Sequence, residues 1–571
     1  MTASYIALTI LVGVAAADRP SGRSIASSTY DRYCVACHGE LGDGRGPAAP
    51  FTWSAPRSFV KGEYKWQSTP IGQAPTDDDL RTTIRFGAPG TSMHAFGDVL
   101  SAVELTSVIT RIKSFDPSLF ANPMQQVFNA GPTRPQNRER GLELWNKSGC
   151  ATCHGVHGKG DGPAAIHFKP YDLTALPLRR PREHDDVDSR RRVAVTSIAL
   201  GVAGTQMPSY ALPEADLWAL ADHVVELGKD GRRRGIALDE ADISRDRAAP
   251  LDTAIWPGTG SDAAIWGQHL ATQGTPPITL APAQASLSAK QCGRCHAKQF
   301  REWSGSLHGA AGSPGLYAQL DGTQAGDGMK DTCRRCHAPL AEQSPGSVYD
   351  TALRDEGVTC ASCHVRAWTR NGPGASATLL ADPAYPKQDR AIYERGDFCM
   401  PCHQLPPRNG LGGKPLLNTY KEWLEGPYMR RGIQCQHCHM PNREHQWLGI
   451  HDKDTFRQGI RLDVDARRTD RGASVVADLA NIGAGHYLPT TPTPAVWLRI
   501  ELLDRDNHPI PGARDETRIG RDLWFDGTWH ERADTRIPPG EKVTFVKAWR
   551  GGSAKEAAIA RVTVEVWPDD Y

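Results

Sequence analysis

Apolar and polar residues follow different patterns along the 571-residue chain, and each pattern predicts a different structure. In SAVELTSVITRIKSF (residues 101–115) and EADLWALADHVVEL (residues 214–227), apolar residues recur at helical spacing. From residue 458 onward, IRLDVDA, WLRIELLD and RVTVEVW alternate apolar with polar residues, and the stretches PTTPTP and PPGEK punctuate them. Residues 458–571 are therefore predicted to form an all-β, sandwich-like domain.

A third pattern lies at the N-terminus, where YIALTILVGVAAAD (residues 5–18) is continuously apolar and ends in small residues. The run is too short to span a bilayer and is typical of a secretory signal peptide, although the residues before it carry no Lys or Arg. We expect residues 1–17 to be a signal peptide and the chain to be periplasmic, secreted or at the cell surface; a start further upstream stays open. No later segment is apolar enough to be transmembrane.

Cysteine usage adds the chemistry, because all 14 cysteines fall in Cys-x-x-Cys-His motifs and none is left over. A zinc ribbon does not need histidine directly after each second cysteine, and a thioredoxin-type motif occurs once. The spacing suits one short helical turn that offers two thiols to the vinyl groups of a haem c and an imidazole to its iron. We predict seven haem c groups. The attachment sites, numbered 1 to 7, are Cys34/Cys37/His38, Cys150/Cys153/His154, Cys292/Cys295/His296, Cys333/Cys336/His337, Cys360/Cys363/His364, Cys399/Cys402/His403 and Cys435/Cys438/His439.

Sites 1 and 2 open an internal repeat. CVACHGELGDGRGPAAP and CATCHGVHGKGDGPAAI share their glycines, and each is followed by a methionine stretch, GAPGTSMHAF or GVAGTQMPSY. Residues 25–122 and 130–230 therefore each resemble a class I cytochrome c domain. That resemblance implies small helical folds with His38 and His154 as proximal ligands and Met93 and Met207 as distal ligands. His94 follows Met93 where proline is common, so it stays a rival ligand, and core packing is the alternative role for the methionines.

Residues 231–285 read as a linker, and five motifs are then packed into residues 292–439. So little chain per haem means that the haems form much of the core and lie close together. CGRCHAKQFREWSGSLHG and CQHCHMPNREHQWLGIHD make residues 286–457 resemble the multihaem cytochromes related to the tetrahaem cytochrome of nitrification and the hydroxylamine-oxidoreductase group. The resemblance implies bis-histidine iron and stacked haem pairs. The expected fold is mainly α with little regular secondary structure around the haems, followed by the β-domain.

Distal ligands for this cluster have to come from histidines outside the motifs, because methionine is scarce there. The first candidate is His308, in the segment most like the family's distal-ligand helix. His486 lies in the glycine-rich NIGAGHYLPT, where glycines allow close backbone approach, and as a ligand it would clamp the β-domain onto a haem. The other candidates are His269, His445 and His451.

Two similar segments of the chain leave the distal face of one haem open to two interpretations. FREWSGSLH corresponds to YKEWLEGPY, with Tyr428 where His308 stands. Tyr428 is then either a packing residue or the lining of an open haem face. The only residues that we could nominate around such a face are Tyr428, His437 and Arg430 or Arg431, and no catalytic residue is assigned.

Axial methionine raises the potential of a haem, so two higher-potential haems and five lower-potential ones are expected. We predict a heptahaem electron carrier without chemistry of its own, whose partners are small cytochromes, a membrane quinol-oxidising complex or an extracellular acceptor. Two alternatives stay open: an oxidoreductase acting on a small nitrogen or sulfur compound at one open haem, and a subunit of a cytochrome filament, homo-oligomer or membrane-associated complex. A net charge of +1 gives no support for nucleic-acid binding.

Overall fold

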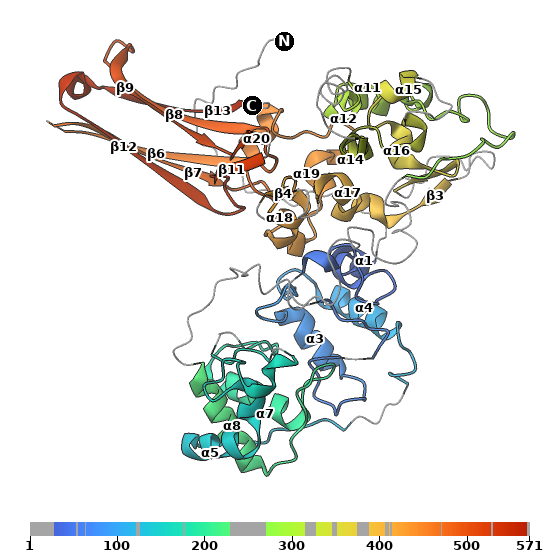
Figure 1. Ribbon diagram of the computed structural model, residues 1–571, viewed down its shortest axis with the longest axis vertical. Helices are drawn as coiled ribbons and strands as arrows, with labels where there is room; N and C mark the ends of the chain where they lie inside the picture. Colours follow the sequence, from blue (N-terminus) through green and yellow to red (C-terminus); the bar gives the residue numbers. More distant parts are fainter. Residues whose placement is uncertain are drawn as a thin grey trace. The chain divides into compact units, whose positions relative to one another are not determined.

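The computed structural model describes residues 28–567 apart from short gaps and three longer ones, and it divides into two compact units, Ser27–Ala264 and Ile265–Tyr571 (Figure 1). The gaps are residues 53–54, 63, 122–125, 169, 175–177, 229–269, 314–326, 345–350, 374–386, 406–409, 412–413, 470 and 527–528. The predicted signal peptide, most of the predicted linker and His269 lie outside the described residues.

The unit formed by residues 27–264 contains two similar sets of helices. The first set is α1 (Thr29–Tyr33), α2 (Val35–His38), α3 (Asp77–Phe86) and α4 (Ala102–Lys113), and the second is α5 (Arg138–Lys147), α6 (Cys150–His154), α7 (Val187–Leu200) and α8 (Glu214–Leu227). Both helices predicted from apolar spacing are confirmed, as α4 and α8. Helix α5 lies directly on α8, because a Cβ at Gly141 would come within 2.0 Å of the Ala219 carbonyl oxygen and glycine has none.

Residues 289–459 form short helices with little regular structure between them, as expected around haems. The helices are α10 (Ala289–Cys292), α11 (Ala297–Ser304), α12 (Leu307–Ala310), α14 (Asp327–His337), α15 (Thr351–Asp355), α16 (Cys360–His364), α17 (Met400–His403), α18 (Thr419–Glu425), α19 (Cys435–His439) and α20 (Lys453–Gly459). The small strands are β1 (Val365–Arg366), β2 (Thr369–Gly372), β3 (Lys387–Asp389), β4 (Gly410–Leu411) and β5 (Lys414–Pro415).

The strand-rich region predicted at the C-terminus is confirmed, as two three-stranded antiparallel sheets and a hairpin. The sheets have the strand orders β12-β7-β6 and β13-β8-β9, and β10 pairs with β11. The strands are β6 (Ile460–Thr469), β7 (Gly472–Asn481), β8 (Ala495–Leu503), β9 (Pro509–Ile519), β10 (Arg521–Phe525), β11 (Trp529–Asp534), β12 (Lys542–Arg550) and β13 (Ile559–Trp567). Alternate residues of β7 and β8 are buried, so each sheet has one apolar face.

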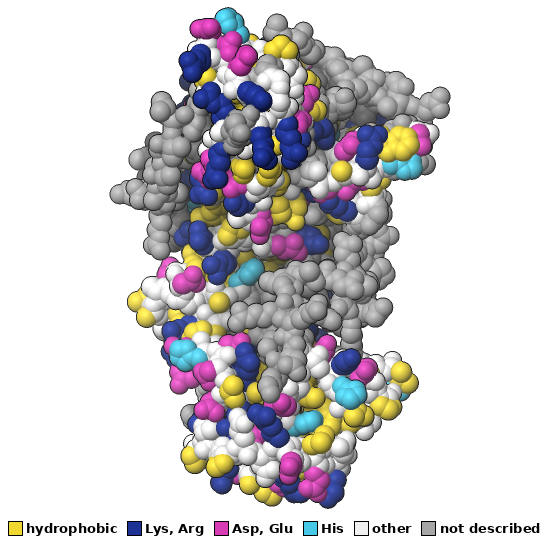
Figure 2. All heavy atoms as spheres, turned by 90° about the vertical axis from the view of Figure 1, so that its left-hand side faces the viewer, with side chains coloured by type: hydrophobic (Ala, Val, Ile, Leu, Met, Phe, Trp, Pro, Cys, Tyr) yellow, Lys and Arg dark blue, Asp and Glu magenta, His cyan; other side chains and the backbone are white. Residues whose placement is uncertain are grey.

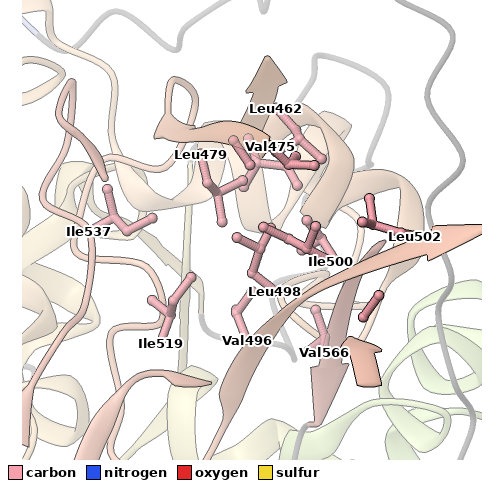
Figure 3. Close-up of a cluster of buried hydrophobic side chains, with 14 of the residues drawn as sticks. Leu462, Val475, Leu479, Val496, Leu498, Ile500, Leu502, Ile519, Ile537 and Val566 are labelled. Carbon is pink, nitrogen blue, oxygen red and sulfur yellow. The ribbon is translucent and has the colours of Figure 1, made fainter. Parts of the chain in front are cut away.

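One hydrophobic core joins the two sheets, as Figure 3 shows. Leu462, Val475 and Leu479 come from one sheet, and Leu498 and Ile500 come from the other. This core needs no haem, because the strands supply its apolar surface themselves. It gives the loops at the sheet ends, including the one that carries His486, a rigid support.

In the view of Figure 2, basic and acidic side chains are intermingled on the described surface, in keeping with 66 basic and 65 acidic residues. Among the helices that the structure describes, none combines the length and the apolar character required to cross a bilayer.

Candidate haem-binding sites

The two cysteines of a motif lie on one turn of backbone, as their spacing suggested. The Cys37 amide donates to the Cys34 carbonyl at 3.2 Å, and the Cys295 amide donates to the Cys292 carbonyl at the same distance. At site 2, Cys153 lies within helix α6. None of the 14 cysteines, all of which the structure describes, is part of a disulfide. Each motif therefore offers two thiols from one short segment.

The second cysteines of the first three motifs differ in exposure. Cys37 and Cys153 are half-buried, whereas Cys295 is exposed, and so is His296 directly after it. These two residues lie at the surface of the polypeptide, as Cys438 of site 7 does. The thioether roles of all 14 cysteines stay predictions.

The motif histidines are oriented in a way that suits an iron ligand. In five of the seven, the histidine Nδ1 lies against a backbone carbonyl, which can only accept a hydrogen bond, so Nδ1 carries the proton and Nε2 is left to bind metal. The carbonyl partners are Arg57 for His38 (3.0 Å), Tyr171 for His154 (3.3 Å), Ala311 for His337 (3.2 Å), Asn371 for His364 (2.7 Å) and Leu448 for His439 (2.5 Å).

Burial keeps several of these imidazoles neutral, which is the form that binds metal. It lowers the pKa of His364 and of His403 to about 4, and it also lowers the pKa of His38 and of His154. A neutral ring with Nδ1 tied to a carbonyl is prepared to donate Nε2 without first losing a proton.

The two methionine loops have the same hydrogen bonds. The amide of Ala88 donates to the Met93 carbonyl (3.0 Å), and the amide of Val202 donates to the Met207 carbonyl (3.1 Å). The Met93 amide donates to the hydroxyl of Thr91 (3.1 Å), as the Met207 amide does to the equivalent Thr205 (3.2 Å). The sequence repeat is therefore a structural repeat, and it holds both methionines in equivalent loops.

Three motif histidines each face a second histidine from elsewhere in the chain. The ring centroids are 6.2 Å apart for His403 and His308, 6.2 Å for His364 and His445, and 6.1 Å for His439 and His486. A ligand nitrogen lies about 2.0 Å from its metal and about 1.1 Å from its ring centroid, so two imidazoles on opposite sides of one iron have centroids about 6.2 Å apart. Each pair is spaced as the two axial ligands of one haem would be.

The cysteines of different motifs also meet. The thiol of Cys292 (site 3) lies beside that of Cys360 (site 5), that of Cys336 (site 4) beside that of Cys402 (site 6), and that of Cys399 (site 6) beside that of Cys435 (site 7). Attachment sites far apart in sequence are thus adjacent in space. Haems bound there would lie close enough for electrons to pass between them.

Some buried polar groups have no hydrogen-bond partner among the described residues, and a bound haem could supply one. They include the Tyr64 hydroxyl, Trp145 Nε1 and Arg180 Nη1 in the unit of residues 27–264. Haem propionates are acceptors that such donors satisfy, and a guanidinium binds a carboxylate well. The residues present therefore fit the predicted prosthetic group.

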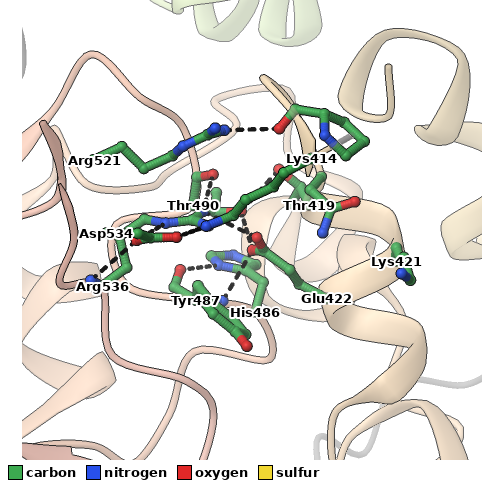
Figure 4. Close-up of polar contacts among 12 residues, drawn as sticks. Lys414, Thr419, Lys421, Glu422, His486, Tyr487, Thr490, Arg521, Asp534 and Arg536 are labelled. Carbon is green, nitrogen blue, oxygen red and sulfur yellow. Dashed lines mark hydrogen bonds and ion pairs between the residues drawn. The ribbon is translucent and has the colours of Figure 1, made fainter. Parts of the chain in front are cut away.

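The β-domain is joined to site 7 by a buried polar network (Figure 4). Glu422 of α18 accepts from the Tyr487 amide (3.1 Å) and the Thr490 hydroxyl (2.6 Å), and it pairs with Arg536 at 3.0 Å. The Glu422 and Arg536 side chains are only 3% and 1% exposed. This network fixes the backbone beside His486, whose own Nδ1 lies 2.9 Å from the Tyr487 carbonyl.

The glycine-rich loop closely approaches the segment that follows α18, as its sequence suggested. A Cβ at Gly485 would come within 2.9 Å of the Tyr428 ring, and Tyr428 donates to the Ile482 carbonyl at 3.3 Å. Tyr428 therefore packs against the loop that carries His486, which supports its interpretation as a packing residue. His437 Nδ1 accepts from the Gln434 amide of its own motif at 2.9 Å.

Sites 3 and 4 differ from the other three in the cluster. Among the described residues, no second imidazole packs against His296 or His337. His451 is exposed, and His269 lies outside the described residues, so both stay predictions. The described end of the predicted linker is packed on the cluster, where Leu270 pairs with Leu340 and the Gln284 carbonyl accepts from Arg370.

Comparison with known proteins gives three family matches on separate segments. Residues 24–110 match the family model for cytochrome c oxidase, cbb3-type, subunit III, residues 138–228 match cytochrome c, and residues 291–365 match cytochrome c554 and c-prime. No curated protein gives a significant match.

Two solved structures are similar over parts of the chain. A chain of the reducing HAO-like protein complex of Kuenenia stuttgartiensis is 30% identical, with 35% of this chain and 93% of that chain covered and a TM-score of 0.32. A penta-heme cytochrome c552 from Thermochromatium tepidum is 20% identical, with 51% of this chain and 93% of that chain covered and a TM-score of 0.41.

Each segment matched by a family model contains at least one Cys-x-x-Cys-His motif with a buried or half-buried histidine. The chain therefore belongs to the c-type cytochromes. Because the motifs recur on three independently matched segments, it is a multihaem c-type cytochrome that binds haem c.

Proposed function

We propose that the chain binds seven haem c groups and carries electrons between redox partners outside the cytoplasm. The observation that carries this proposal is the spacing of His308, His445 and His486 from three motif histidines, at 6.1–6.2 Å between ring centroids. Irons with two protein ligands exchange electrons without binding substrate. The thiol contacts between motifs support short steps from one haem to the next.

The proposed ligands divide the haems into two classes. Met93 and Met207 would give haems 1 and 2 higher potentials, and bis-histidine ligation would give the cluster lower ones. Electrons would then run downhill from the cluster to the two cytochrome c domains, which dock a small redox partner through a modest interface. Export through the signal peptide would place this chain in the periplasm or at the cell surface.

Replacing Met93 or Met207 with leucine tests the two classes. Each substitution should remove one iron–sulfur charge-transfer band and lower the reduction potential of one haem, because leucine cannot ligate iron. Visible spectroscopy and redox titration measure both effects, and Met440→Leu, at a residue outside the proposed ligand set, is the control. An unchanged band in Met93→Leu would show that Met93 is not the ligand and leave His94 as the rival.

A second candidate function is redox catalysis at site 3 or 4, because only these cluster sites lack a facing imidazole among the described residues. Addition of carbon monoxide to the reduced protein tests it. Binding by the unsubstituted protein, with a carbon monoxide band that shifts when His337 or His296 is replaced, would place an open iron at that site, and small nitrogen and sulfur compounds would be the substrates to try. If carbon monoxide does not bind, electron transfer is the one proposed function that stays.

A further inference from the structure

One tryptophan lies between two of the proposed distal ligands. The indole of Trp447 is 4.5 Å from the ring of His308 and 5.4 Å from the ring of His445, measured between centroids. It is almost perpendicular to both, with interplanar angles of 88° and 89°. A single side chain thus contacts imidazoles that face two different motif histidines, His403 and His364.

The loop that carries Trp447 contacts a third site as well. The Leu448 carbonyl, next in the chain, lies against Nδ1 of His439, the motif histidine of site 7. The loop is also fixed from outside the motifs, since the His445 amide donates to Glu302 of α11 at 2.9 Å. Residues 445–448 therefore touch sites 5, 6 and 7 within four positions.

The backbone at Trp447 is left-handed, with φ at +48°. Non-glycine residues seldom adopt this conformation, and bulky ones do so where the surrounding structure holds them there. Here the conformation aims the indole at both imidazoles.

The two imidazoles lack the well-formed oxygen contact that five of the seven motif histidines have. Nδ1 of His308 and Nδ1 of His445 are both buried without a hydrogen bond of ordinary geometry among the described residues. The backbone of Arg443 lies near His445, and the nearest Glu302 carboxylate oxygen is 4.0 Å from its Nδ1. By contrast, His486 Nδ1 has the Tyr487 carbonyl at 2.9 Å. Each of the two rings therefore depends on packing for its orientation, and Trp447 is the aromatic contact that they share.

We propose that Trp447 is a positioning residue that sets the ring orientation of two distal ligands at once, His308 over haem 6 and His445 over haem 5, and so couples the electronic states of two neighbouring haems. The inference rests on the ligand pairs of the proposed function. It predicts that one substitution changes two haems and leaves haem 7 alone.

EPR of the oxidised holoprotein separates the haems concerned. Near-perpendicular imidazole planes give a larger maximal g value than near-parallel planes, and the planes meet at 79° for His308/His403, 41° for His445/His364 and 12° for His486/His439. Trp447→Phe should shift the signals of the first two pairs, and Trp447→Ala should convert two haems to a form that binds carbon monoxide when reduced. The rhombic signal of the third pair should be unchanged in Trp447→Phe, because phenylalanine keeps an aromatic ring in the loop whose Leu448 carbonyl contacts His439.

Trp368→Phe is the matched control, because Trp368 also has a left-handed backbone (φ +62°) but donates to the Gly274 carbonyl rather than packing on a distal histidine. Trp447 variants that alter one signal, or none, would overturn the inference. His308→Ala and His445→Ala test the ligand pairs separately, since each should convert one haem only. If neither does, the proposed ligand pairs fail, whatever the Trp447 variants show.

Discussion

Replacing His486 with alanine is expected to convert one haem of the seven from a low-spin, six-coordinate form to a high-spin form that takes up carbon monoxide when reduced. His486 is stacked over His439, with 6.1 Å between the ring centroids and 12° between the planes. Burial lowers the pKa of His486, so the ring is neutral and ready to bind iron. Alanine leaves that distal position without a ligand.

The measurement is quantitative EPR, with the carbon monoxide difference spectrum of the reduced protein. His508→Ala is the control, because His508 belongs to the same β-domain but its side chain is 76% exposed. A variant that keeps all its low-spin haem would exclude His486 as the ligand. The β-domain would then be joined to the cluster by polar contacts alone.

Replacing Glu422 with alanine is expected to lower the free energy of unfolding of the unit that holds the cluster and the β-domain by about 1–3 kcal/mol, because it removes one of the two carboxylates that pair with the buried Arg536 and leaves Asp534 as the other. Glu422 also accepts from Tyr487 and Thr490, so the same change frees the loop that carries His486. Haem 7 should therefore lose its low-spin signal at a lower denaturant concentration than the other haems.

Denaturant titration followed by visible spectroscopy measures both effects. Asp465→Asn is the control, since its ion pair with Arg467 is exposed on both sides and should contribute at most about 1 kcal/mol. In Glu422→Ala, haem 7 could instead lose its low-spin signal at the same denaturant concentration as the other cluster haems. That result would contradict a local role for Glu422 at the His486 loop.

Much of this architecture was visible in short-range patterns. Apolar spacing is local, so it predicted α4, α8 and the C-terminal strands, and the paired methionine stretches predicted two loops that prove to share their hydrogen bonds. The close approach around His486 followed from its glycines, as the contact of Gly485 with the Tyr428 ring shows. The signal peptide and the ligand roles of His269 and His451 stay predictions.

The remaining features depend on contacts between distant segments. No sequence pattern predicts that His308 faces His403. The chain between them follows its haem sites and contains no repeating element that would fix the distance. The exposure of Cys295 and Cys438 could not be predicted either, since the seven motifs share one pattern. The buried pair of Glu422 and Arg536 joins residues 114 positions apart without any local pattern.

Trp447 was overlooked although it stands two residues after His445. An isolated tryptophan in a loop is more often simply packed, and its contact with His308 joins segments that lie far apart in the sequence. Its left-handed backbone conformation is a property of the folded chain, and it cannot be predicted from the residue type.

The central claim is that these histidine pairs are axial ligands of haems in a seven-haem electron carrier. Quantitative EPR of the oxidised holoprotein, with carbon monoxide added to the dithionite-reduced form and the haem content of the same sample, tests it most directly. We expect seven haems per chain, with haems 5, 6 and 7 low-spin and unreactive toward carbon monoxide. Fewer haems, or carbon monoxide binding that His308→Ala, His445→Ala and His486→Ala leave unchanged, would contradict it.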